Sequence, residues 1–372
     1  MGKASPPESL PSTAASTPFT SPLLLKCPPD LSGSPTSATW WARLRLCLGL
    51  SSRSTFRLVM LGSLVLGMVI GAAGSVAAWA LYNHGSGGLP WGGHWPPAAP
   101  KAWTKGERRR LVVHGRDVWV YRPSQPSEGA PPLPAVVVLH GSNDTALNIA
   151  NATGMEKVAE ESTGFLAVFP EMVTPRGMSW GFNDTSELAF FRAMVERIGS
   201  EYALRRDQVY VVGHSNGGTM SLFLQNNMDD IFGGAAAVES GVGHLEVWNN
   251  QSKGCPTMVI WNHKDPVLAA FGGEDLYQDT ITKLRRHDHT GVGPSSMEPL
   301  PVGSSGVLYA ERLSWSSSSD VPALSVISWA STIPTHHWLN PAAVPGTSLD
   351  ASWLVWQFFS TLPHQPARWM SV

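Results

Sequence analysis

The stretch "QVYVVGHSNGG" (Gln208–Gly218) joins an apolar run to a serine enclosed by glycines. The apolar run is too short for a helix and is typical of a strand buried on both faces. Gly213, Ser215 and Gly217 then fit the pattern G-x-S-x-G, in which a sharp strand-to-helix turn leaves the serine hydroxyl exposed. Glycines are needed there because a side chain would collide with the tight turn or the neighbouring backbone. The stretch predicts a nucleophilic serine at the carboxyl end of a central strand.

Similar short apolar runs occur on both sides of this stretch. They are "PAVVVLHG" (134–141), "FLAVFPE" (165–171), "TMVIWN" (257–262) and "LSVISW" (324–329). The segments between them carry apolar residues at helical spacing, for example in "LAFFRAMVERI" (188–198), and "RLVVHGRDVWVYRP" (110–123) is typical of a hairpin that turns near Gly115. Alternating strands and helices predict an α/β domain with a doubly wound, mostly parallel sheet.

Composition limits the classes of function. The chain has 372 residues, of which 43% are hydrophobic and 15% charged, so it can bury at least one large core. Its formal net charge is −2, which gives no reason to expect a nucleic-acid partner.

The N-terminal part of the chain has a different composition. Residues 1–57 are rich in Ser, Thr and Pro and carry only two acidic residues, which predicts a disordered tail. Residues 58–82 contain no charged side chain and are long enough to cross a bilayer as a helix. Residues 83–107 form a linker rich in Gly, Pro and Trp, and residues 108–366 form the predicted α/β domain.

The charges beside the apolar segment predict its orientation. Four arginines between positions 43 and 57 precede it, and the next basic residue after it is Lys101. The positive-inside rule therefore places the N-terminus in the cytoplasm and the α/β domain in the lumen or outside the cell, as in a type II membrane protein. A buried soluble helix and an organelle transit peptide are the alternatives. Small residues recur every four positions from Ser63 to Ser75, which favours a homodimer through this helix.

Glycosylation sequons agree with a lumenal domain. Four Asn-x-Ser/Thr sites follow the apolar segment, at Asn143, Asn151, Asn183 and Asn250. The sequence therefore predicts a glycoprotein.

A serine hydroxyl needs a base against it and an acid that orients the base. When the serine lies in a G-x-S-x-G elbow, the acid follows it at a strand end and the histidine comes last. Asp265 follows the strand "TMVIWN", and His336 follows "LSVISW", so Ser215, Asp265 and His336 form the predicted triad. Glu274 and Asp275 are the rival acids, and His337 is the rival base.

The reaction also needs two backbone N–H groups that bind the oxyanion of the tetrahedral intermediate. Asn216 follows the nucleophile at the start of a helix, and Ser142 follows the strand "AVVVLHG", so their amides are the predicted pair. We expect no cofactor. A metal site in His287-Asp288-His289 is an alternative, although its position beside two arginines at a helix end is more typical of a solvated segment.

Taken in order, these motifs resemble the polyhydroxybutyrate depolymerase and feruloyl esterase group of the α/β-hydrolases. The resemblance rests on "VVVLHG", "FLAVFPE", "SWGFND", "QVYVVGHSNGG", "MVIWNHKDP" and "THHW", and covers about residues 108–363. It implies an α/β-hydrolase fold and maps the catalytic histidine, two residues before a Trp, onto His336. It also implies that Trp180 and Asn183 line the substrate cleft, and we expect His214 there as well, supporting the elbow rather than transferring protons.

These observations together predict a membrane-anchored serine ester hydrolase whose substrate is a carboxylic ester. A hydrolase fold that only binds a partner is the main alternative, since fold does not determine function. A serine peptidase or an acyltransferase would use the same acyl-enzyme.

Overall fold

The structure is a computed structural model. It describes residues 106–124, 131–162, 164–173, 177, 179–182, 184–243, 252, 255–287, 290, 291, 293–303, 306–316 and 322–363. The predicted tail (1–57), the apolar segment (58–82) and most of the linker (83–107) lie outside these residues, so the structure does not test them. In the part of the chain that is described, no helix has the length and apolar composition needed to cross a membrane.

The described strands form one ten-stranded sheet in the order β1-β2-β4-β3-β5-β6-β7-β10-β9-β8. The six strands from β4 to β10 in this order run parallel, and the pairs at both edges are antiparallel. The bounds are β1 Glu107–Val113, β2 Arg116–Arg122, β3 Leu133–Leu139, β4 Leu166–Pro170, β5 Leu204–His214, β6 Gly234–Val238, β7 Thr257–Asn262, β8 Ser296–Pro299, β9 Val307–Ser316 and β10 Pro322–Ser331.

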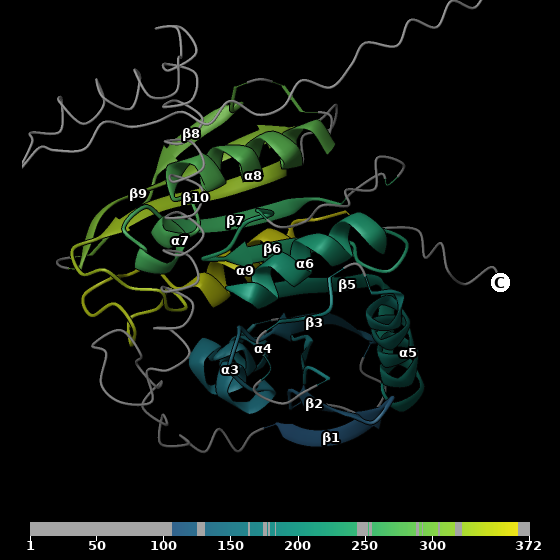
Figure 1. Cartoon of the computed structure of the whole chain (residues 1–372). Coiled ribbons are helices and arrows are strands. Elements are labelled where there is room, and N and C mark those ends of the chain that lie inside the picture. Colours follow the sequence, from purple (N-terminus) through teal and green to yellow (C-terminus); the bar gives the residue numbers. More distant parts are fainter. Residues whose placement is uncertain are drawn as a thin grey trace, which may run out of the picture. The chain divides into compact units, whose positions relative to one another are not determined.

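Helices cover both faces of this sheet (Figure 1). Residues of α5, α6, α7 and α8 belong to one hydrophobic core, and residues of α3, α4 and α9 belong to the other. The bounds are α3 Ala146–Thr153, α4 Met155–Glu161, α5 Thr185–Glu201, α6 Asn216–Asn227, α7 Pro266–Ala270, α8 Glu274–His287 and α9 Ala351–Ser360. The prediction of a doubly wound, mostly parallel sheet is confirmed.

Strand β3 shows why its sequence is apolar throughout. Ala135, Val137 and Leu139 point into one core, whereas Val136 and Val138 point into the other. Side chains alternate between the two faces of a strand, and here each face is covered by helices. A central strand of this kind carries no polar face.

The sequence predicted most of these strands, but not all. The five apolar runs form β3, β4, β5, β7 and β10, and the predicted hairpin is β1–β2. His114 and Gly115 both have positive φ at its turn, 47° and 77°, as a type I′ hairpin turn requires. Strands β6, β8 and β9 were not predicted.

The carboxyl ends of the parallel strands bring the candidate site together. Ser142 follows β3, Ser215 follows β5, Asp265 follows β7 and His336 follows β10. Because parallel strands end at the same edge of a sheet, residues far apart in the sequence meet there.

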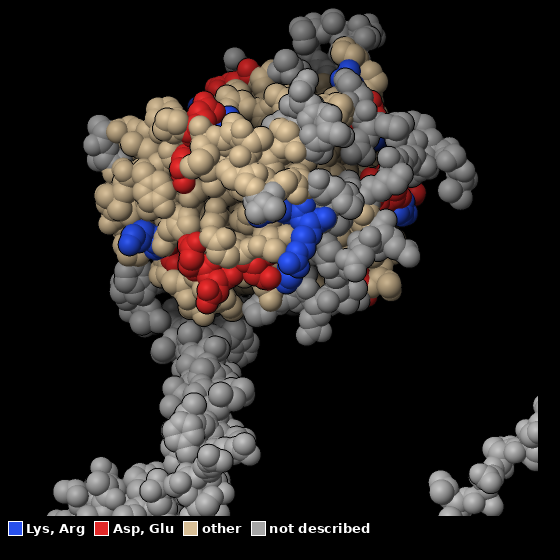
Figure 2. All heavy atoms as spheres, turned by 90° about the horizontal axis from the view of Figure 1, so that it is seen from above, with Lys and Arg blue, Asp and Glu red and all other residues tan. Residues whose placement is uncertain are grey.

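Charge on the described surface is mixed in sign. Figure 2 shows one face of the molecule, on which small groups of acidic and basic side chains lie next to one another and neutral surface surrounds these groups. Ion pairs join the two signs of charge on several elements, for example Arg110–Asp117 in the β1–β2 hairpin and Lys283–Asp279 in α8.

Candidate active site

Ser215 lies in a strained turn between β5 and α6. Its backbone is left-handed, with φ 53° and ψ −124°, which is rare for a residue other than glycine. The turn is tight, because a Cβ on Gly213 would lie 2.1 Å from the Gly217 oxygen and one on Gly217 would lie 2.4 Å from the Leu139 oxygen. Only glycine fits at either position, so the geometry is that of a nucleophile elbow.

His336 connects Ser215 to Asp265. Its Nε2 lies 2.8 Å from Ser215 Oγ, and its Nδ1 lies 2.5 Å from Asp265 Oδ2. With the proton on Nδ1 donated to the carboxylate, Nε2 is free to accept the serine hydroxyl proton. The three side chains predicted for the triad therefore form one hydrogen-bonded series, and the bridging imidazole is that of His336 rather than that of the rival His337.

Asp265 is held rigidly. Its side chain is fully buried, and its Oδ1 accepts hydrogen bonds from the N–H groups of Val267 (2.7 Å) and Leu268 (3.0 Å) at the start of α7. The residue is thus a helix cap as well as the partner of His336. The rival acid Glu274 instead lies 3.1 Å from His263 Nδ1 at the start of α8.

Two further histidines surround His336. The His214 ring lies 5.0 Å from the His336 ring, and burial, followed by the charges of His336 and His337, lowers the pKa of His214 well below its usual value. Burial, followed by the charge of His336, also lowers the pKa of His337. Both neighbours are therefore neutral at physiological pH, and the imidazolium that would form during catalysis faces no second cation there.

The loop that carries His336 is fixed to the second core. Trp338 is completely buried, and its Nε1 donates to Ser352 Oγ (2.9 Å) in α9. Ser352 Oγ in turn donates to the Thr153 oxygen (2.7 Å) at the end of α3. The tryptophan two residues after the base thus acts as an anchor for the loop.

The loop after β3 runs beside Ser215 on its other side. A Cβ built on Gly141 would lie 3.2 Å from Ser215 Cβ, so the backbone that leads to Ser142 passes close to the serine. Asn216, at the first position of α6, has a backbone N–H without an acceptor inside the helix. Both positions therefore lie beside Ser215, and their pairing as an oxyanion hole stays a prediction.

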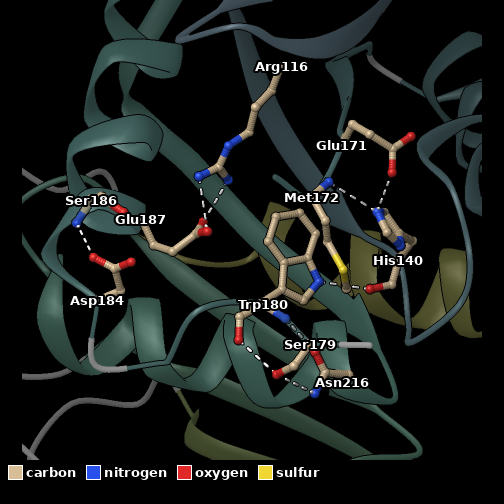
Figure 3. A network of polar contacts seen from close by, with 10 residues as sticks. All are labelled: Arg116, His140, Glu171, Met172, Ser179, Trp180, Asp184, Ser186, Glu187 and Asn216. Atoms are coloured by element: carbon tan, nitrogen blue, oxygen red, sulfur yellow. Dashed lines mark hydrogen bonds and ion pairs between the residues drawn. The ribbon is translucent and has the colours of Figure 1, made fainter. Parts of the chain in front are cut away.

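Figure 3 shows that Trp180 connects Asn216, at the start of α6, to His140, directly after β3. Its backbone N–H donates to Asn216 Oδ1 (2.9 Å), and its indole Nε1 donates to the His140 oxygen (2.9 Å). Asn216 Nδ2 also donates to Ser179 Oγ (3.4 Å). The Asn216 side chain therefore fixes the segment that holds the loop after β3, a role that the sequence did not predict for it.

His140 completes this support beneath the loop (Figure 3). It is fully buried, its Nδ1 donates to the Gly141 oxygen (2.9 Å), and its Nε2 lies 2.9 Å from Glu171 Oε1 and 3.3 Å from the Met172 nitrogen. Glu171 Oε2 also accepts the N–H of Ala146 at the start of α3. These contacts fix the start of the loop after β3.

Two of the residues expected to line the substrate cleft do not do so. Trp180 is 1% exposed and packs on His140 and Phe191, and His214 is 6% exposed behind His336. Both side chains point into the domain: Trp180 holds the His140 oxygen, and His214 packs against the ring of His336. The prediction of a cleft-lining role is wrong for both, and Asn183 lies outside the described residues.

Figure 3 also shows a buried ion pair between Arg116 in β2 and Glu187 in α5. Arg116 donates to both oxygens of Glu187, at 2.8 and 3.0 Å, and its guanidinium lies 4.1 Å from the Phe190 ring. Bidentate pairs of this kind are geometrically specific. This pair fixes the start of α5, directly after the segment that contains Trp180.

The described residues contain no group of three His, Cys, Asp or Glu side chains placed to bind a metal ion. Of the alternative metal segment 287–289, only the backbone of His287, at the end of α8, is described. Asn143 and Asn151 are exposed, and the sequons at Asn183 and Asn250 lie outside the described residues.

The sheet order and the serine elbow, with the acid and the histidine on later loops, define an α/β-hydrolase fold. Comparison with solved structures agrees. An acetyl xylan esterase from Aspergillus awamori superposes with a TM-score of 0.51 at 14% identity, over 68% of this chain and 99% of that one. No protein-family model matches the chain.

Sequence comparison finds similar esterases. Feruloyl esterase B of Neurospora crassa is 32% identical over 121 residues, which are 30% of this chain and 40% of that protein. NocK of Nocardia uniformis subsp. tsuyamanensis, which bears an esterase name, is 28% identical over 174 residues, which are 44% of this chain and 50% of NocK. The chain thus spans about half the length of the curated relatives it matches. The expected resemblance to α/β-hydrolase esterases, including feruloyl esterases, is confirmed.

Proposed function

We propose that this protein is a serine carboxylic ester hydrolase. The observation that carries the proposal is the series from Ser215 Oγ through His336 to Asp265, built on a left-handed elbow serine. The partial similarity to proteins named as esterases supports the same reaction class.

In the proposed reaction, Ser215 Oγ attacks the ester carbonyl carbon while His336 Nε2 accepts the hydroxyl proton. The carbonyl π electrons move onto oxygen, and the amides of Ser142 and Asn216 stabilise that oxyanion. When the intermediate collapses, His336 returns the proton to the departing alcohol and an acyl-enzyme remains. Water then attacks the acyl-enzyme by the same route and releases the acid. Asp265 keeps the imidazole in the correct tautomer throughout.

Feruloyl and acetyl esters are the proposed substrate classes, because they are the acyl groups named in the similar proteins. The test is hydrolysis of feruloyl, acetyl and hydroxybutyryl esters by the full-length chain, with Ser215→Ala as the control. We expect turnover of at least one ester by the wild type and none above background by the variant. Equal turnover by both proteins would contradict the proposal.

The same assay separates the alternative reaction classes. Added alcohol would divert product from free acid to a new ester if the protein were an acyltransferase, and cleavage of peptide amides in preference to esters would indicate a peptidase. A folded wild type without any turnover would favour a protein that only binds its partner.

We also propose that residues 58–82 anchor the enzyme as a type II membrane protein with the α/β domain on the lumenal side. The uncharged 25-residue segment and the arginines before it support this arrangement. Resistance of the expressed chain to alkaline carbonate extraction, together with a mass shift on glycosidase treatment, is the expected result. Release into the carbonate supernatant would contradict it, and crosslinking in the membrane tests the homodimer.

A further inference from the structure

A second carboxyl group is buried beside the triad. Glu239 directly follows β6, is fully buried, and has a left-handed backbone with φ 49°. Its Oε2 accepts the N–H of Asn262 (3.0 Å) at the end of β7, and its Oε1 accepts Nε1–H of Trp329 (3.1 Å) in β10. Strained, buried polar residues cluster at functional sites, so this side chain calls for an explanation.

Glu239 and Asp265 are both held by Asn262: the Glu239 carboxyl accepts the N–H of Asn262 (3.0 Å), and the oxygen of Asn262 accepts the N–H of Asp265 (3.1 Å). The two buried carboxyl groups are therefore neighbours, close enough for the charge of Asp265 to act on Glu239. Two carboxyl groups hydrogen-bond to each other only when one of them carries a proton. Asp265 already faces three donors, namely Nδ1–H of His336 and the N–H groups of Val267 and Leu268. Each of these donors stabilises Asp265 in its ionised form. The proton therefore belongs to Glu239.

The surroundings of Glu239 agree with a neutral acid. Its contacts from Asn262 and Trp329 are neutral donors, and Asp265 is the charged group that acts on it. Burial, followed by the negative charge of Asp265, raises the pKa of Glu239 well above its usual value. His336 lies beyond Asp265, and the imidazole of His337 also interacts with the charge of Asp265.

We propose that Glu239 is a positioning residue of the triad, a neutral carboxylic acid that donates a hydrogen bond to Asp265 and holds that carboxylate in place for His336. The inference rests on the proposed function, because Glu239 acts on the reaction only through Asp265. It leaves one net negative charge behind the imidazole instead of two. A second, ionised carboxylate there would stabilise the imidazolium further and make His336 a base only at higher pH.

The test is the pH profile of Ser215 labelling by a fluorophosphonate probe, measured on the full-length chain from pH 5 to 9. This readout depends on the activated serine but not on knowledge of the natural ester. Glu239→Gln keeps a donor toward Asp265 and remains uncharged, although its amide nitrogen can no longer accept one of the two bonds from Asn262 and Trp329. The lost bond can slow labelling, but because the charge beside Asp265 is unchanged we expect the midpoint of the profile to stay where it is in the wild type. If Glu239 were ionised, removing its charge would lower the midpoint by roughly one unit or more, and that result would overturn the proposal.

Glu239→Leu tests whether Glu239 positions Asp265 or only fills space in the core. The leucine cannot donate to Asp265, so we expect roughly tenfold slower labelling and a midpoint above that of the wild type. An unchanged rate and midpoint would show that the side chain is only structural. Glu156→Gln is the matched control, because Glu156 is also buried but pairs with Arg108 on β1, away from the triad. Its profile is expected to match the wild type.

A second readout does not require activity. Between pH of about 4.3, where free glutamic acid titrates, and the raised native value, the folded chain retains a proton at Glu239 that the unfolded chain has lost. The contribution of Glu239 to stability therefore falls as the pH rises through this window, and Glu239→Gln is expected to remove this contribution from the pH dependence measured by thermal or urea unfolding. Equal slopes for wild type and variant would overturn the proposal. An unlabelled wild type would contradict the proposed function, and the unfolding comparison would still decide where the proton lies.

Discussion

The two sides of Ser215 are held by different kinds of interaction. On one side, side-chain hydrogen bonds join residues that are far apart in the sequence. His336 lies 121 residues after Ser215 and 71 residues after Asp265, and it contacts both directly. On the other side, the candidate oxyanion groups are backbone amides, and the side chains of Trp180 and Asn216 only hold the loops that carry them. In the proposed reaction the first side would therefore perform the proton transfers, whereas the second would supply fixed geometry.

Substitution of the base tests the first side most strongly. We expect His336→Ala to reduce kcat by about 10⁵- to 10⁶-fold, as loss of a triad base does in serine hydrolases, because no other group would remove the Ser215 proton. Steady-state hydrolysis of a responsive ester measures this, with circular dichroism as the control for folding. Activity within a hundredfold of the wild type would show that another group is the base.

Asp265→Asn should have the next largest effect. The amide preserves the shape of the side chain and an acceptor for the cap of α7, but it no longer stabilises the imidazolium or the Nδ1–H tautomer. A loss of about 10⁴-fold in kcat is expected by analogy with the Asp-to-Asn change in chymotrypsin-type enzymes. The melting temperature serves as the control, and a loss below tenfold would contradict the role given to Asp265.

Trp180→Phe tests the second side. The ring remains, but the donor to the His140 oxygen is lost, so the loop before Ser142 becomes less well fixed. Direct loss of an oxyanion donor costs about 10²- to 10³-fold, so this indirect change should lower kcat by roughly tenfold with little change in KM. Trp356→Phe in α9 is the matched control and should leave both constants unchanged. A change confined to KM would indicate a substrate contact instead.

His214→Gln should give the smallest effect, one of stability. The pKa of His214 is lowered by burial, so below pH of about 6.5 the unfolded chain gains a proton that the folded chain does not. The contribution of His214 to stability is therefore expected to fall as the pH falls, by on the order of 1 kcal/mol per pH unit at most. Urea unfolding at pH 5 and 7.5 should show a weaker pH dependence for the variant. An unchanged dependence would mean that His214 is not the group responsible.

The sequence predicted the side of the site that depends on residue order. A strand, a serine between glycines, a later acid and a final histidine have spacings that leave few arrangements, and Ser215, Asp265 and His336 do meet. The parallel strands were also predictable, because their valine-rich runs are buried on both faces.

Other features depend on tertiary packing that one sequence does not display. Strand β6, "GAAAV", was missed because Gly and Ala have low strand propensity, and Glu239 at its end was missed with it. Strand β9 carries Glu311 and Arg312 in its centre, which hides its apolar pattern. The inward direction of Trp180 was equally hidden, since a tryptophan among polar residues fits a cleft as well as a core.

The central claim is that Ser215 is a nucleophile activated by His336. The most direct measurement is fluorophosphonate treatment of the full-length wild type and of His336→Ala, followed by mass spectrometry of the peptides. The account predicts a stoichiometric phosphonyl adduct on Ser215 in the wild type and no detectable adduct on the same schedule in the variant. A folded wild type without an adduct, or equal labelling of both proteins, would contradict it.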